Sequence, residues 1–150
     1  MRFTADTNVF IYLTDGDDID RRDAARILVA RLRDRDTLIG LQVVGEVQNV
    51  LRRKYARPVR DACDFALTLL SNFPDFSYEQ TDVRVALEAS RAGAMQYWDA
   101  LLVSAAGRAG CNFIFTEDMH DGTIFEGVEI VKPFDKSGVL TERAREILEF

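Results

Sequence analysis

The chain has 150 residues, of which 47% are hydrophobic and 29% charged, and its net charge is −6. This composition suits one compact domain over residues 1–150 with a sizeable core, and it excludes a disordered chain. No apolar run is long enough to span a bilayer, and the negative balance argues against a general nucleic-acid binder.

Short apolar segments alternate with segments of helical periodicity. In chain order we expect a strand at 2–5, a short helix starting at 9–13, a helix at about 20–34, a strand at 37–40, helices at 42–55 and 59–72, a weak strand at 76–78, helices at 81–91 and 98–109, strands at 112–115 and 128–131, and a terminal helix at about 141–150. Strands alternating with helices predict an α/β fold with a mostly parallel sheet covered on both faces.

Several residues define the ends and faces of these helices. Asp18 or Asp20 can cap the helix at 20–34, and Thr141 can cap the terminal helix, because their side-chain oxygens accept from free N–H groups. The helix at 98–109 is rich in small residues and can pack closely on the sheet. For the helix at 59–72 we expect the inner face to consist of Cys63, Ala66, Leu67 and Leu70.

Four acidic residues stand where helices or strands begin or end: Asp6, Glu46, Asp99 and Asp118. In a parallel α/β sheet, strand ends and the helix starts that follow gather along one edge, so these carboxylates are expected to converge. Clustered like charges raise one another's pKa. A hard divalent cation such as Mg²⁺ or Mn²⁺ relieves the repulsion and prefers oxygen ligands.

Each of the four acids also has a simpler structural interpretation. Asp6 and Asp118 could be turn residues after a strand, Glu46 could be an exposed first-turn residue facing the helix dipole, and Asp99 could cap its helix. Three neighbours are candidate auxiliary residues: Asn8, Thr116 and Asp121. Asp121 with Gly122 is equally a turn dipeptide.

A local basic strip runs against the negative average charge. Residues 52–60 carry five cations and no acid, which suits a polyanion bound beside an acidic centre. Asn49, Arg52 and Arg53 are candidate substrate contacts, although cations in the last turns of a helix also favour its dipole. Tyr55 could stack on a base or cover the core.

The acidic motifs resemble those of the PIN-domain nucleases, in the same order and over essentially the whole chain. The matching segments are Asp6-Thr7-Asn8, Gly45-Glu46-Val47, Trp98-Asp99-Ala100 and Thr116-Glu117-Asp118-Met119. Chains of this size resemble VapC ribonuclease toxins of type II toxin–antitoxin modules. The fourth motif departs from the asparagine-containing form of many toxins.

This resemblance implies a three-layer α/β/α fold, Mg²⁺ or Mn²⁺ dependence and cleavage of RNA. It also implies a homodimer and an antitoxin protein that blocks the site. We therefore expect a metal-dependent endoribonuclease, with Asp6, Glu46, Asp99 and Asp118 as catalytic residues and metal ligands. The alternatives are an inactive PIN-like module that binds RNA or protein, and a nucleotide-sensing Rossmann-like domain.

Other catalytic chemistries lack their residues. Cys63 and Cys111 form no CxxC pair, so structural zinc is not expected, and reduced thiols in a cytoplasm are the favoured interpretation. His120 is the only histidine, which rules out a two-histidine ribonuclease mechanism. No GxSxG elbow and no phosphate-binding glycine loop occurs in the sequence.

Overall fold

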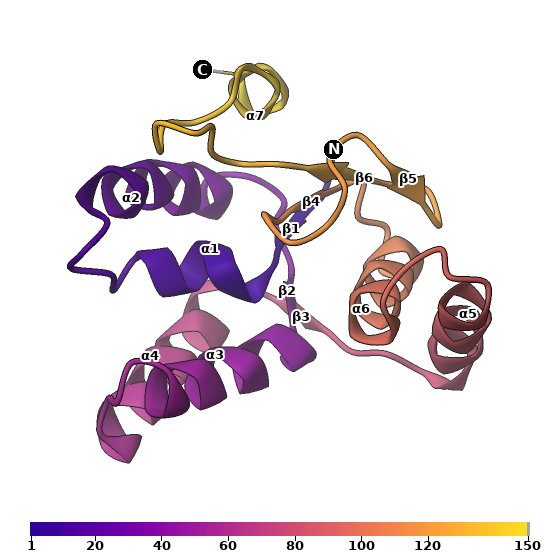
Figure 1. Ribbon diagram of the computed structural model, residues 1–150, viewed down its shortest axis with the longest axis horizontal. Helices are drawn as coiled ribbons and strands as arrows, with labels where there is room; N and C mark the ends of the chain where they lie inside the picture. The colour runs from indigo at the N-terminus through magenta and orange to yellow at the C-terminus, as the bar shows by residue number, and fades with distance from the viewer. Residues whose placement is uncertain (150) are drawn as a thin grey trace.

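A mostly parallel sheet runs through the centre of the computed structural model, which describes residues 1–149 (Figure 1). Its four-stranded part has the order β1-β4-β6-β5, with bounds Phe3–Ala5, Phe113–Phe115, Val128–Val131 and Ile124–Phe125. β2 (Ile39–Gly40) and β3 (Asp75–Phe76) form a second, two-stranded parallel sheet. An isolated parallel bridge between Phe3 and Thr37 joins the two sheets.

The register of the central strands aligns their carboxyl ends. Ala5 of β1 lies opposite Phe115 of β4, and Phe115 lies opposite Val131 of β6. These strand residues are buried, as expected for parallel strands that are covered on both faces. Residues that directly follow β1 and β4 therefore emerge side by side at one edge of the sheet.

Seven helices surround the sheet within residues 1–149. They are α1 (Thr7–Tyr12), α2 (Ile19–Arg33), α3 (Leu41–Arg53), α4 (Val59–Asn72), α5 (Gln80–Arg91), α6 (Tyr97–Arg108) and α7 (Glu142–Leu148). Figure 1 shows α1 to α4 on one side of the sheet and the α5–α6 pair on the other. The predicted α/β/α architecture is confirmed. None of the helices in residues 1–149 has the length and apolar character needed to cross a membrane.

Two predicted caps form as expected. Asp18 accepts a 3.1 Å hydrogen bond from the Arg21 N–H, whereas Asp20 lies inside the first turn of α2. Thr141 accepts from the Ala144 N–H at 3.2 Å and starts α7. The predicted end of this helix, at residue 150, lies outside the described residues.

Close packing of α6 on the sheet depends on its small residues. A Cβ atom added to Gly107 would lie 2.5 Å from the Glu126 carbonyl oxygen in the turn between β5 and β6. Most of α6, including Ala105 and Ala106, is buried. The predicted packing of this helix is confirmed, and it fixes the helix that carries Asp99.

Two sequence-based expectations were wrong in detail, and one strand was missed. The buried face of α4 consists of Ala62, Ala66 and Leu69, while Leu67 and Leu70 are 59% and 37% exposed. The predicted buried face was therefore rotated around the helix axis. The face that is actually buried follows an i, i+4, i+7 spacing. The weak strand at 76–78 forms instead at β3. The short antiparallel β5 was not predicted at all.

Candidate active site

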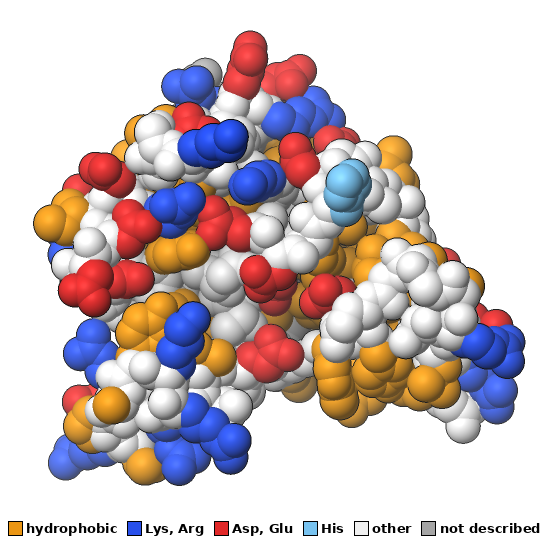
Figure 2. All heavy atoms as spheres, viewed as in Figure 1, with side chains coloured by type: hydrophobic (Ala, Val, Ile, Leu, Met, Phe, Trp, Pro, Cys, Tyr) orange, Lys and Arg blue, Asp and Glu red, His pale blue; other side chains and the backbone are white. Residues whose placement is uncertain are grey.

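The four predicted acids surround one cavity of about 340 Å³. Asp6 follows β1, Asp118 follows β4, Glu46 lies on α3, and Asp99 lies in the first turn of α6. Figure 2 shows acidic side chains gathered around a hollow at the centre of this face. The lining consists of Asp6, Thr7, Asn8, Ile11, Tyr12, Glu46, Val50, Lys54, Tyr55, Asp99, Glu117 and Asp118.

Asp6 is the most deeply placed of these acids, with 6% of its surface exposed. Its Oδ1 accepts a 2.7 Å hydrogen bond from the Thr7 N–H, and its Oδ2 accepts one of 2.8 Å from the Thr116 hydroxyl. Burial raises the pKa of Asp6 to about 6; the two hydrogen bonds oppose this, and the charges of Glu46 and Asp99 add to it. Asp6 is thus the N-terminal cap of α1. Its charged form is destabilised by burial.

Glu46 and Asp99 enter the cavity from helices on opposite sides of the sheet. Glu46 is the sixth residue of α3, not a first-turn residue, and its Oε2 accepts a 2.7 Å hydrogen bond from the Thr7 hydroxyl. Asp99 does not cap α6, since Gln96 holds that position and accepts from the Asp99 N–H at 3.1 Å. Burial, then the charges of Asp118 and Glu46, raise the pKa of Asp99.

Asn8 connects the ends of β1 and β4. Its amide nitrogen donates to Asp118 Oδ2 at 3.0 Å and to the Thr116 hydroxyl at 3.4 Å. Because a carboxylate can only accept, this bond fixes the orientation of the amide. The Asn8 Oδ1 atom is then buried with no hydrogen-bond partner, which leaves an oxygen available to a water or a cation.

The donor set suits a hard divalent cation in its chemistry. All candidate ligands are oxygens, two of the carboxylates have raised pKa values, and Asn8 offers an unpartnered oxygen. Yet within residues 1–149 no three His, Cys, Asp or Glu side chains lie close enough together to form a metal-binding group. No three of these acids therefore share one coordination sphere within residues 1–149. Mg²⁺ commonly binds through one or two carboxylates and keeps several waters, so the wider spacing fits it.

Some predicted site residues lie outside the cavity lining. Asp121 lies in a turn and accepts a hydrogen bond from the Lys132 N–H at 2.7 Å, and its auxiliary role remains a prediction. Thr116 lies behind the cavity, fully buried. Asn49, Arg52 and Arg53 are exposed on α3 and do not line the cavity. Their role as substrate contacts remains a prediction.

Several lining residues were not among the predicted site residues. The Tyr12 hydroxyl donates to Glu117 Oε2 at 2.7 Å, and Arg21 forms a 3.4 Å ion pair with Glu117 Oε1. Glu117 therefore has Arg21 and Tyr12 as partners, whereas its neighbour Asp118 faces the other acids. Tyr12 follows Asn8 by four residues, a spacing that places both on one face of α1 and that could have revealed Tyr12.

The fold and the site define an α/β protein with an acidic cavity at the carboxyl edge of its sheet. The family model described as "PIN domain" matches residues 4–120. The chain therefore belongs to the PIN-domain family.

Two solved structures share this fold. VapC20 of Mycobacterium tuberculosis, described as a sarcin–ricin loop cleaving toxin, has a TM-score of 0.62 and 19% identity, over 77% of this chain and 91% of that one. VapBC2 of Rickettsia felis, bound to a DNA fragment from its promoter, has a TM-score of 0.58 and 15% identity, over 79% and 89% of the two chains. No curated protein matches the sequence.

Proposed function

We propose that this protein is a metal-dependent endoribonuclease that hydrolyses RNA phosphodiester bonds. The observation that carries the proposal is the placement of Asp6, Glu46, Asp99 and Asp118 around one cavity, with burial and mutual repulsion raising the pKa of two of them. Family membership supports it, as does the likeness in fold to VapC20, which is described as a sarcin–ricin loop cleaving toxin.

Asp6 and Asp99 are the proposed direct ligands of Mg²⁺ or Mn²⁺, and Glu46 and Asp118 would bind a second ion or position water. Such an ion supplies a water of lowered pKa and positive charge opposite the phosphate. The chain's own residues then orient the acids. Thr116 holds Asp6, Thr7 holds Glu46 and Asn8 holds Asp118. Attack by water rather than by the ribose 2′-hydroxyl predicts products with a 5′-phosphate and a 3′-hydroxyl.

Asp6→Asn tests the catalytic proposal, because it keeps the shape and removes the charge. We expect purified protein to cleave RNA with Mg²⁺ or Mn²⁺ and to stop in EDTA, and the variant to be inactive while remaining folded. Asp64→Asn, a matched change at an exposed residue of α4, should keep full activity. Sequencing of the cleaved RNA ends would identify the 5′-phosphate. Full activity of Asp6→Asn would contradict the assignment.

One observation favours a second candidate function, a PIN-like module that binds RNA or protein without cutting it. Within residues 1–149 the acids do not form a ready-made metal-binding group. This candidate predicts RNA binding with no metal-dependent cleavage at any tested Mg²⁺ or Mn²⁺ concentration. Cleavage by pure wild-type protein that EDTA abolishes would exclude it.

We further propose that the protein acts in the cytoplasm as the toxin of a toxin–antitoxin pair and forms a homodimer. The likeness to VapC20 and to the VapBC2 assembly supports the pairing. Light scattering of the purified chain tests the dimer, and co-expression with the product of a neighbouring gene tests the antitoxin. An antitoxin should co-purify and suppress cleavage. If no neighbouring gene product does so, the toxin–antitoxin proposal is wrong.

A further inference from the structure

The C-terminal part of α3 gives the acidic cavity a basic end. Glu46, Val50 and Lys54 all line the cavity at a spacing of four residues, so they form one stripe along the helix. Lys54 lies about 12 Å along the helix from Glu46, at about 1.5 Å per residue. It is the one cation in a lining that otherwise holds five carboxylates, as far as residues 1–149 are concerned.

Tyr55, next to Lys54, presents an aromatic ring at the same end. The ring packs partly on the core and lines the cavity. The Lys54 ammonium nitrogen lies over the ring, 6.0 Å from its centroid. An unusual turn follows Tyr55, in which Ala56 has a φ of +50°, a value that residues other than glycine rarely adopt. Such strained turns persist where surrounding contacts hold them, and they recur at functional sites.

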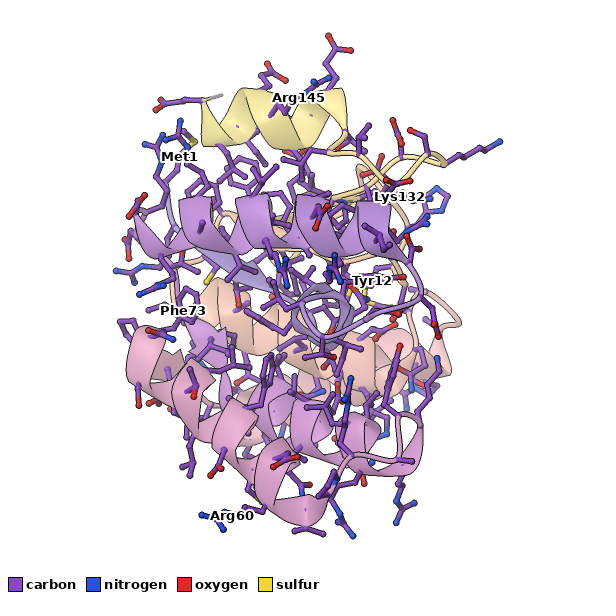
Figure 3. All side chains as sticks on the ribbon, turned by 90° about the vertical axis from the view of Figure 1, so that its left-hand side faces the viewer. Met1, Tyr12, Arg60, Phe73, Lys132 and Arg145 are labelled. Atoms are coloured by element: carbon purple, nitrogen blue, oxygen red, sulfur yellow. The ribbon has the colours of Figure 1, made fainter. Side chains whose placement is uncertain are left out.

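Two hydrogen bonds from Arg57 hold this turn in place. Its N–H donates to the Leu51 carbonyl at 2.9 Å, and its guanidinium donates to the Thr14 carbonyl at 3.2 Å. Two cations of the basic strip, Arg57 and Arg60, do not line the cavity. Arg57 is a structural clamp, and Arg60 lies at the lower edge of the molecule in Figure 3, far from Tyr12 of the cavity.

We propose that Lys54 and Tyr55 form a nucleotide subsite, in which Lys54 binds a phosphate next to the scissile one and Tyr55 stacks on an unpaired base. This inference rests on the proposed ribonuclease function and adds to it a subsite beside the acids, built by two residues that the catalytic proposal does not use.

The charge distribution and the partly exposed ring support this occupant. Glu117 is paired with Arg21, but the other carboxylates of the lining repel a polyanion. The neighbouring phosphate therefore needs a cation beyond them, and Lys54 stands at that place. A tyrosine ring recognises a base by stacking, which requires a base that is free of its helical neighbours. Paired bases in duplex RNA do not offer that face.

Binding of a labelled single-stranded oligoribonucleotide, measured by fluorescence anisotropy in the inactive Asp6→Asn protein, tests the subsite. Adding Lys54→Met or Tyr55→Leu should weaken binding by about fivefold or more, while Tyr55→Phe should change it by less than about twofold. Lys54→Met should also reduce the slope of log K against log salt concentration by about 0.7. Tyr55→Leu should leave the affinity for duplex RNA unchanged.

Matched controls separate a local subsite from general attraction. Arg60→Met removes one charge from the same strip, and Tyr78→Leu removes another partly exposed ring, 47% accessible, that does not line the cavity. Both should change affinity by less than about twofold. Equal losses for Lys54→Met and Arg60→Met would overturn the subsite, as would unchanged binding by Tyr55→Leu.

A second measurement keeps the test decisive if Tyr55→Leu fails to fold. Ultraviolet crosslinking of the Asp6→Asn protein to the same RNA, followed by mass spectrometry, should place an adduct on Tyr55, and adducts only elsewhere would overturn the proposal. If wild-type protein cleaves RNA but the subsite variants bind normally, only the subsite is wrong. If those variants bind weakly and wild-type protein never cleaves, only the ribonuclease proposal is wrong.

Discussion

Asp6 combines deep burial with a raised pKa, so the residue that is most important to the proposed chemistry also destabilises the fold. Its pKa of about 6 lies above the ordinary value of 3.8, so the folded state binds a proton more tightly than the unfolded state. Protonation of Asp6 therefore stabilises the folded state fully below about pH 4, and this contribution to the free energy of unfolding is lost as the pH rises through about 6.

From this linkage we predict that Asp6→Asn stabilises the protein near neutral pH. The shift corresponds to at most about 3 kcal/mol, and we expect a gain of about 1–3 kcal/mol in the free energy of unfolding at pH 7.5. At pH 4, where Asp6 is largely protonated, the gain should disappear. Urea unfolding of both proteins at the two pH values measures this. A gain that is equal at both would show that Asp6 is not the titrating group.

Thr116 is a second residue whose role can be isolated. Its hydroxyl donates to Asp6, and it accepts from the Asn8 amide and, at 3.2 Å, from the Asp118 N–H. Thr116→Val keeps the shape but leaves these buried partners unsatisfied, at a cost of about 1–3 kcal/mol. Because the Thr116 hydrogen bond lowers the pKa of Asp6, the variant's cleavage should also require a higher pH.

Thr116→Ser restores the hydroxyl and is the matched control. It should recover most of the stability and the wild-type pH profile of cleavage. If Thr116→Val loses stability but keeps the wild-type profile, then Thr116 supports the fold alone and does not position Asp6.

At the scale of elements, the sequence predicts what strong local patterns encode. β4 and β6 are apolar runs bounded by turn residues, and α6 has a small-residue face, so their places were predictable. β5 was not, because its turn places both Glu126 and Gly127 at positive φ, and glutamate rarely signals such a turn.

The sequence predicts which acids gather around the cavity, but it does not predict the distances between them. Boundary positions place Asp6 and Asp118 at one edge of the sheet, whatever the details of packing. The spacing between carboxylates depends on side-chain rotamers and helix placement at the ångström scale, which no residue pattern encodes. The prediction for the basic strip came from its number of cations. Which of these cations lines the cavity depends instead on the four-residue spacing along α3 from Glu46 through Val50 to Lys54.

The contact between α6 and the β5–β6 turn gives a prediction at this scale. Gly107→Ala would place a methyl group 2.5 Å from a backbone oxygen, which cannot move as a flexible side chain can, so we expect a loss of about 1–3 kcal/mol. Gly45→Ala, on α3, meets no atom within 4 Å and should instead stabilise by up to about 1 kcal/mol. Thermal unfolding compares them. A tolerated Gly107→Ala would contradict this close packing.

At the scale of the whole molecule, a net charge of −6 is distributed so that five carboxylates and one lysine line a single cavity. The folded state concentrates negative charge there, while the unfolded chain disperses it. A cation that binds only the folded arrangement therefore stabilises the protein by mass action, by about 2.7 kcal/mol at one hundred times its dissociation constant.

We predict that Mn²⁺ raises the melting temperature of the wild-type protein at pH 7.5, and raises it less at pH 5.5, because protons compete for Asp6, whose pKa is about 6. Differential scanning calorimetry across a Mn²⁺ titration measures the effect without any cleavage assay. Asp64→Asn should behave as wild type, whereas Asp6→Asn should lose most of the shift. An equal shift in Asp6→Asn would place the ion elsewhere on this acidic chain and would remove the physical basis for a metal at the cavity.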